Sequence, residues 1–237
     1  MDNNYRSSSF ASTASRVSYD SGLRQYMCKV YNSMAIALGI SAIVAFLASS
    51  SPAVMHALFA TPLAWVIALA PVGFVIFFGF KLNSISAQKA QNYLWIYSAL
   101  MGLSLSFIFV IYTGASVART FLIASSTFGA MSLYGYTTKK DLTSIGSFLM
   151  MGLIGLIIAS IVNIFLKSSA LDFAISLIGV FIFIGLTAYD TQRIKQSYYY
   201  SSDSEMISKM AVIGALNLYM DFINLFLMML RFFGDRK

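Results

Sequence analysis

The chain has 237 residues, of which 58% are hydrophobic and only 11% are charged, and its mean hydropathy is +0.75. This composition excludes an ordinary soluble domain and indicates an integral membrane protein. The single cysteine and single histidine exclude a disulfide framework and multi-ligand Cys or His metal sites, so we expect no cofactor. The net charge of +7 comes from scattered basic residues without a basic, aromatic-interleaved face, so we expect no nucleic-acid partner.

Residues 1–28 are rich in Ser and Asn and lack an apolar run, which predicts a mobile cytosolic N-terminal tail. Residues 29–237 are expected to form a single domain, because apolar segments take up most of this part of the chain. The predicted membrane spans are 30–50, 59–80, 92–112, 116–136, 145–166, 170–190 and 209–232. The sequence therefore predicts an all-α membrane protein, a bundle of seven transmembrane helices.

The positions of Lys and Arg predict the orientation of the chain, because these residues are retained on the cytosolic side. With a cytoplasmic N-terminus, eleven of the sixteen basic residues fall in cytosolic segments and five on the other side. The basic C-terminus does not follow this rule, and a re-entrant last segment is the alternative to a seventh crossing. The length of the run 210–233 favours the crossing. Short loops and small size favour a bacterial inner membrane.

The last predicted span carries a row of polar residues. Asp221 lies in the middle of the apolar run 215–233, between Asn217 and Asn224. At about 100° per residue these side chains share one stripe of the helix with Arg231. A stripe with an ionisable group is costly in lipid, so we expect this helix to be enclosed by the others. Asp221 then marks a functional interior.

A second acid lies near the cytosolic end of the sixth span, where Tyr189 and Asp190 stand next to each other. The spacing permits contact between Asp190 and Asp221 but does not demand it. Two carboxyls in a dry interior cannot both ionise at low cost, so on contact they would share one proton. Its loss would push the helices apart and open an acid-lined path for cations, divalent ones above all. The alternative is that each Asp only accepts hydrogen bonds or pairs with Arg193 or Arg231.

At these residues the sequence resembles the transmembrane Bax inhibitor motif family. The matching segments are YDTQRI at 189–194, LYMDFINLF at 218–226, LRFFG at 230–234 and TKKDL at 138–142. The resemblance implies a last helix wrapped by the other six, and a pH-sensitive calcium leak controlled by an aspartyl pair. Those roles fall on Asp190 and Asp221. It also implies a basic residue beside the pair at the cytosolic end of the second span, for which Lys81 is the nearest candidate.

Further candidates surround this hypothesis. Tyr189, Asn217, Asn224 and Arg231 are candidates for supporting the pair. Asp172, at the outer end of the sixth span, either draws in cations or is a solvated carboxylate at a helix start. The expected partners are calcium ions and the lipid bilayer, and the sequence does not identify a protein partner.

Two other functions compete with a leak. One is a non-conducting regulatory or binding membrane protein whose acids only stabilise the bundle, and a proton-coupled transporter is a variant of the conducting hypothesis. The other is an intramembrane aspartyl protease, in which one carboxyl acts as base and the other as acid. Tyr189-Asp190 fits such a protease, but Met220-Asp221 departs from its Gly-x-Gly-Asp pattern and no proline follows Pro71. We therefore do not expect an enzyme.

Overall fold

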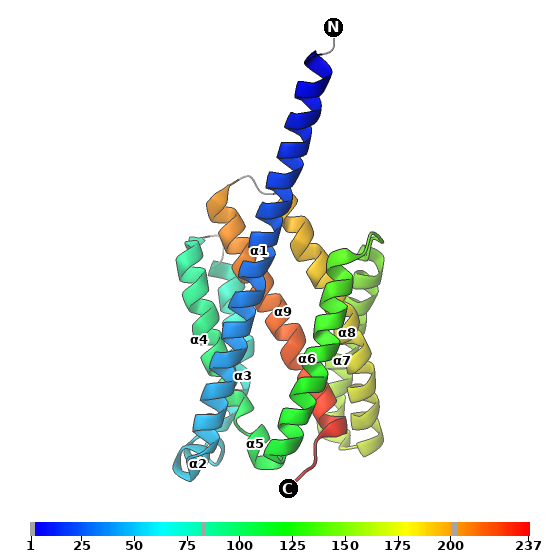
Figure 1. Ribbon diagram of the computed structural model, residues 1–237. Helices are drawn as coiled ribbons and strands as arrows, with labels where there is room; N and C mark the ends of the chain where they lie inside the picture. The colour runs from blue at the N-terminus through cyan, green and yellow to red at the C-terminus, as the bar shows by residue number, and fades with distance from the viewer. Residues whose placement is uncertain (1–2, 82–83, 201–202) are drawn as a thin grey trace.

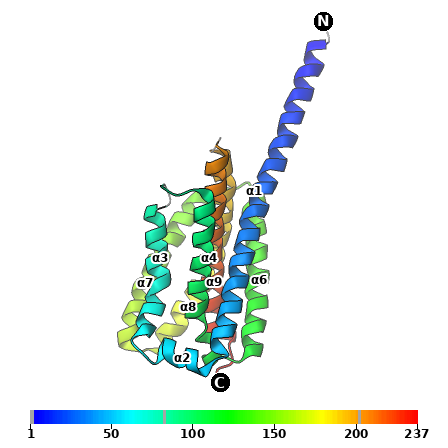
Figure 2. The same ribbon diagram turned by 90° about the vertical axis from the view of Figure 1, so that its left-hand side faces the viewer.

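The computed structural model describes residues 3–81, 84–200 and 203–237, with side chains described from residue 21 onward. Long helices run beside one another as one elongated bundle, and the N-terminal part of the first helix projects from one end (Figures 1 and 2). The helices are α1 (Asn3–Ser49), α2 (Pro52–Phe59), α3 (Leu63–Lys81), α4 (Ala87–Leu105), α5 (Ile108–Ile111), α6 (Gly114–Thr137), α7 (Thr143–Leu166), α8 (Ser169–Tyr199) and α9 (Ser204–Phe233).

Side-chain caps fix where several of these helices begin. Ser86, Thr113 and Ser168 each accept a hydrogen bond from the backbone N–H three residues later, at the starts of α4, α6 and α8. The Asp203 carboxylate accepts from two backbone N–H groups in the first turn of α9. Such caps satisfy donors that have no partner within the helix. Because α9 begins so soon after Tyr199, it must turn back along α8.

The all-helical prediction is confirmed, and each of the seven predicted span ranges contains a helix. Among the described residues, six segments are long and apolar enough to cross a membrane: 21–49, 63–81, 87–111, 143–166, 169–199 and 204–233. Helix α6 has the same length as α7 but is richer in Ser and Thr, and it is not one of the six.

The start of the bundle differs from the predicted division at residues 28 and 29. Helix α1 is continuous from Asn3 to Ser49 and so runs through the segment predicted as a tail. Leu23, Tyr26 and Met27 are buried against the other helices. The packed domain therefore begins before residue 29, because apolar residues at helical spacing already face the bundle in this segment. The mobility of the tail stays a prediction.

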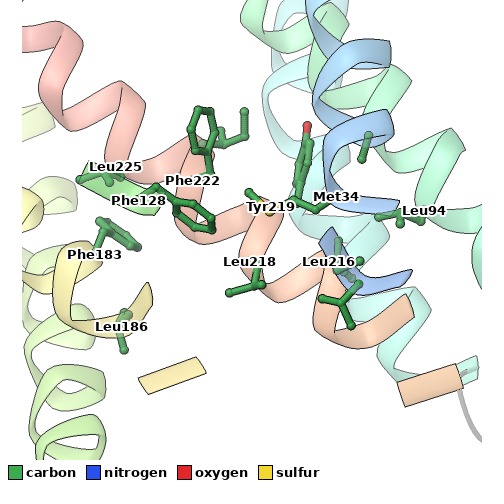
Figure 3. Packing of buried hydrophobic residues seen from close by; sticks show 14 of the residues in the cluster. Met34, Leu94, Phe128, Phe183, Leu186, Leu216, Leu218, Tyr219, Phe222 and Leu225 are labelled. Carbon is green, nitrogen blue, oxygen red and sulfur yellow. The ribbon is translucent and has the colours of Figure 1, made fainter. Parts of the chain in front are cut away.

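Helix α9 is the most buried of the six candidate spans. In its most apolar 18-residue stretch, 67% of the residues are buried, compared with 6% in the corresponding stretch of α7. It packs against α8, α1, α6 and α4. Figure 3 shows Tyr219 among residues of α1 and α4, and Phe222 beside Phe128 of α6. Its apolar residues therefore form much of the core, and the fold brings its polar stripe into the protein.

The outer surface is apolar, as expected for a protein surrounded by lipid. Trp65, Phe80, Phe148 and Phe165 are all more than two-thirds exposed, and they belong to α3 and α7. Large exposed apolar surfaces of this kind mark contact with a membrane or a partner.

The segment after α9, residues 234–237, returns along α5 and the start of α6, and we call it the C-terminal strap. The Asp235 carbonyl accepts a hydrogen bond from Thr113 N–H at 3.0 Å, and Lys237 N–H donates to the Ile111 carbonyl at 2.9 Å. It lies at the end of the bundle opposite to the projecting part of α1 (Figure 1). Helix α9 is thus one unbroken helix that runs the length of the bundle.

Candidate functional site

The two acids singled out by the sequence meet between α8 and α9. The carboxyl groups of Asp190 and Asp221 are within hydrogen-bonding contact. Asp221 is only 6% exposed, and its Oδ2 atom is buried without a hydrogen-bond partner among the described residues. A carboxylate only accepts hydrogen bonds, so a hydrogen bond between two carboxyls needs a proton on one of them.

Local geometry explains why the two acids reach each other. Helix α8 continues for about two and a half turns past Asp190 before it ends at Tyr199. The spacing permitted this contact without requiring it, and the continuation of α8 past the predicted span makes it possible. Helix α9 then runs back, and the helices approach closely where a Cβ on Gly214 would lie 3.1 Å from Ile194. The small residue permits the close approach that brings the acids together.

On one side of the pair, a small cavity of about 190 Å³ opens between α8 and α9, lined in part by Arg193, Ser197 and Asn217. The Arg193 guanidinium follows Asp190 by one turn, and its charge acts on that carboxyl. A cation near one acid stabilises negative charge there, whereas the two acids destabilise each other when both are ionised. The site therefore has one compensating cation for two carboxyls.

The structure does not bring every predicted supporting residue to the pair. Lys81 ends α3 and is exposed, and the basic residue that acts on Asp190 is Arg193 instead. The Tyr189 ring lies against Gly146 of α7. Asn217 lines the small cavity, and Asn224 is half-buried on the same helix. Of these four, Asn217 is the one placed in the cavity beside the pair.

Arg231 and Asp172 meet each other at the other end of the bundle. Arg231 Nη1 donates to Asp172 Oδ1 at 2.9 Å, and the side chains are 41% and 43% exposed. Arg231 therefore lies about three helical turns along α9 from Asp221. Asp172 already has a cationic partner, which weakens its predicted role in attracting cations.

Sequence reasoning missed a chain of hydroxyl groups that ties three helices together next to the pair. Tyr31 hydroxyl contacts Ser132 Oγ at 2.6 Å, and Ser132 Oγ contacts Thr191 Oγ1 at 2.9 Å. Nearby, α6 and α8 are so close that a Cβ on Gly135 would collide with the Ala188 carbonyl. Ala188 and Thr191 flank Asp190 in sequence, but no sequence pattern marks their partner residues on α1 and α6.

Gln192 provides a second link that the sequence did not reveal. Its side-chain oxygen accepts from Leu142 N–H at 2.9 Å, and its amide donates to the Lys140 carbonyl at 2.8 Å. The side chain thus satisfies two backbone groups in the segment before α7. The segments 138–142 and 189–194, which both resemble the family, are therefore in direct contact.

Chemically, the two carboxyls of the site can share a proton, because a hydrogen bond between them needs one. No group of three or more His, Cys, Asp or Glu side chains gathers in the described parts of the chain. Calcium takes six to eight oxygen ligands. A calcium ion beside Asp190 and Asp221 would draw most of its ligands from water and backbone carbonyls.

Comparison with known proteins gives the family. The family described as "Inhibitor of apoptosis-promoting Bax1" (Bax1-I) matches residues 23–237. Uncharacterized protein RP147 of Rickettsia prowazekii is 51% identical over 95% of both chains. Inner membrane protein YbhL of Escherichia coli K12 is 47% identical over 91% of this chain and 94% of its own. An uncharacterized membrane protein of Streptococcus pyogenes serotype M1 is 36% identical over 91% of this chain and 94% of its own.

The family match spans nearly all of the packed helices and starts at residue 23, which is the first buried residue among those whose side chains are described. The six candidate spans and the likeness to YbhL make this a multi-pass inner-membrane protein. The chain belongs to the Bax inhibitor-1 (Bax1-I) family.

Proposed function

We propose that this protein is a pH-sensitive cation leak that passes calcium and is gated by one proton shared between Asp190 and Asp221. The observation that carries the proposal is the contact of two carboxyls from consecutive helices, one of which has a buried oxygen without a partner. With the proton present, the hydrogen bond holds α8 and α9 together. Without it, two negative charges face each other.

The energy of this repulsion is large enough to move helices. Two unit charges 4 Å apart repel by ~4 kcal/mol at an effective dielectric constant of about 20. A whole domain is stable by only about 5–15 kcal/mol. Removing the shared proton therefore changes the free energy of the α8–α9 contact by a substantial part of the stability of the bundle, which favours an open state.

The proposal includes a topology of seven spans with a cytoplasmic N-terminus. Helix α6 supplies the seventh span, because its 24 residues extend ~36 Å, longer than the ~30 Å hydrocarbon core. Helix α9 is then the central helix, enclosed by the other six, which its high burial supports. The small cavity at Arg193 faces the cytosol and the C-terminal strap lies on the other side.

An apolar cluster beyond the pair would close the proposed path. Phe222 packs edge-on against Phe121 and Phe128 of α6, with ring centroids 5.3 and 5.6 Å apart. The adjoining cavity, lined by Phe222 and Phe226 among others, has a volume of only about 90 Å³. The structure therefore corresponds to the closed state of the proposed leak. Opening requires that α9 and α6 separate at these rings.

Calcium flux into liposomes tests the proposal directly. Purified protein in calcium-free liposomes should admit Ca²⁺ faster as the pH is raised through the titration of the pair. Asp221→Asn should remove this pH dependence, because the amide cannot lose the shared proton. Asp172→Asn is the matched control, since it removes an acid from α8 outside the pair and should keep the pH dependence.

The outcomes separate the competing functions. Flux equal to that of empty liposomes at every pH would reject the leak and leave a non-conducting regulatory protein. Flux that saturates and follows an imposed proton gradient would indicate a transporter instead. The same contact of two acids is what an aspartyl protease needs, so peptide cleavage by the same preparation is measured in parallel, with no cleavage expected.

A further inference from the structure

A groove of about 630 Å³ runs between α1 and α6, away from the aspartyl pair. Both helices lie at the front of the bundle in Figure 1. The groove extends along α1 from Arg24 to Tyr31 and along α6 from Phe128 to Tyr136. Its volume is in the range of pockets that bind small molecules. It is far larger than the cavity beside the pair.

The groove opens sideways, toward the lipid. Leu133 on its edge is 63% exposed, and Gly129 and Cys28 are also exposed. No neighbouring atom lies within 4 Å of a Cβ built on Gly129, so the space above this glycine is empty of protein. An apolar groove on the lateral surface of a membrane protein is in contact with acyl chains, because water does not reach it.

One end of the groove is positively charged. Arg24 lines this end and forms no ion pair with the described acids. Tyr136 lines the same groove near the end of α6, and Lys195 Nζ lies 5.1 Å from the centre of its ring. None of the described residues that line the groove is acidic. An Arg side chain binds phosphate oxygens with two parallel hydrogen bonds.

We propose that this groove is a binding site for an anionic phospholipid, with an acyl chain between α1 and α6 and the phosphate on Arg24. Arg24 precedes the predicted first span by about two turns, so it lies at headgroup depth of the leaflet on the N-terminal side. Basic pockets between membrane helices on the cytoplasmic side commonly hold anionic headgroups. The proposal does not rest on the leak function, because it concerns a different surface.

The single cysteine of the chain provides a direct test. Cys28 lines the groove and is exposed, so its alkylation by N-ethylmaleimide reports whether the groove is occupied. Full-length protein in detergent is labelled with added phosphatidylglycerol, with phosphatidylcholine of the same acyl chains, or with inorganic phosphate. Phosphatidylglycerol should slow labelling severalfold, phosphatidylcholine much less, and phosphate not at all.

Two variants locate the headgroup. Arg24→Gln should weaken the protection by phosphatidylglycerol about fivefold, because one basic residue near the membrane surface contributes ~1 kcal/mol. Lys89→Gln is the matched control, since Lys89 is an exposed cation on α4 that does not line the groove. Equal protection by the two lipids, or an equal effect of the two variants, would overturn the headgroup assignment.

Filling the groove with a larger side chain tests, by a second measurement, whether an acyl chain binds there. Gly129→Phe places a ring in the open space, and native mass spectrometry should show severalfold less bound phosphatidylglycerol. Gly39→Phe is the control, because Gly39 of α1 is exposed with open space at its Cβ but lies outside the groove. Unchanged lipid binding in Gly129→Phe, with a melting temperature like that of Gly39→Phe, would reject the site.

Discussion

Helices α8 and α9 meet through charged side chains at two levels, and the two contacts have opposite chemistry. At the inner level, which is nearer the link between α8 and α9, Asp190 touches the buried Asp221. At the outer level Asp172 pairs with Arg231 at 2.9 Å, and both side chains are more than two-fifths exposed. The outer contact joins opposite charges in partial contact with water. The inner contact joins two acids and depends on a proton.

The difference shows how one pair of helices can be held at one end and released at the other. An exposed ion pair is worth at most about 1 kcal/mol, and it persists over a wide range of pH. The inner contact changes from attraction to repulsion when one proton leaves. Between the two levels, Gly179 of α8 packs closely on Met228 of α9. Under the proposed function, the inner ends would separate about this close packing.

The largest expected effect comes from removing both inner carboxyls. Under the proposed function, the native contact holds a proton at neutral pH, whereas an unfolded Asp, whose ordinary pKa is about 3.9, has already released it. Unfolding then releases a proton, so stability falls as pH rises, by about 1.4 kcal/mol per pH unit while the contact stays protonated. The double variant Asp190→Asn, Asp221→Asn should lose this slope in melting temperature measured against pH.

The control for this measurement is Asp172→Asn, which removes an acid from the outer level and should keep the wild-type slope. A double variant that retains the full slope would show that another group, and not the aspartyl pair, binds the proton.

A smaller effect is expected from a larger side chain at Gly179, which lies between the two contacts. A Cβ on Gly179 would lie 2.9 Å from Met228 Sδ and 3.1 Å from Leu156 Cδ1. Gly179→Val should therefore destabilise the protein by about 1–3 kcal/mol, as overpacking usually does. Adding Met228→Ala should restore part of the loss. The measurement is the melting temperature in detergent.

Gly155→Val on α7 is the matched control, because its Cβ meets no atom within 4 Å. Equal losses in the Gly179 and Gly155 variants would mean that the close packing of α8 on α9 is not what the valine disturbs.

The outer ion pair should give a still smaller effect. A double-mutant cycle with Asp172→Asn and Arg231→Gln should yield a coupling free energy below about 1 kcal/mol. Because both side chains contact water, the coupling should shrink further at high salt. A coupling of several kcal/mol would show that the outer contact is much drier than its exposure indicates.

Asp141 is expected to show the smallest effect, and it contrasts with the inner acids because its charge is favoured. Hydrogen bonds from the Thr143 hydroxyl and Thr143 N–H lower the pKa of the Asp141 carboxyl. A lowered pKa adds stability that is present above the unfolded pKa and is lost as the pH falls through the folded one. Asp141→Asn should therefore reduce the melting temperature slightly near pH 7 and not at low pH. The opposite pH trend would contradict this assignment.

The sequence predicted well those features that depend on local patterns. Apolar run length located α3, α4, α6 and α7 to within several residues but missed the early start of α1 and the late end of α8, and the polar stripe predicted that Asp221 would be buried. The contact between Asp190 and Asp221 was one permitted arrangement, and it required α8 to continue past the predicted span. The burial of Leu23, Tyr26 and Met27 was missed because Ser and Asn dominate the surrounding segment.

Features that depend on how helices cross could not be predicted. The resemblance suggested Lys81 as the cation near the pair, but Arg193, which the sequence offered only as an alternative partner, acts on Asp190 from the same helix. Asp172 and Arg231 were considered separately, since no pattern shows that residues 59 positions apart will pair. The groove between α1 and α6 results from the space between two helices that a hydroxyl chain bridges, and helical periodicity does not encode such a gap.

The C-terminal strap has a practical consequence for anyone who handles this protein. Its last residue, Lys237, donates its backbone N–H to Ile111 and its Nζ to the Phe109 carbonyl, so the end of the chain is anchored and not free. A purification handle or fluorescent fusion added after Lys237 would pull on the turn between α4 and α6. Fusions at the N-terminus, where α1 projects from the bundle, would leave that anchorage intact.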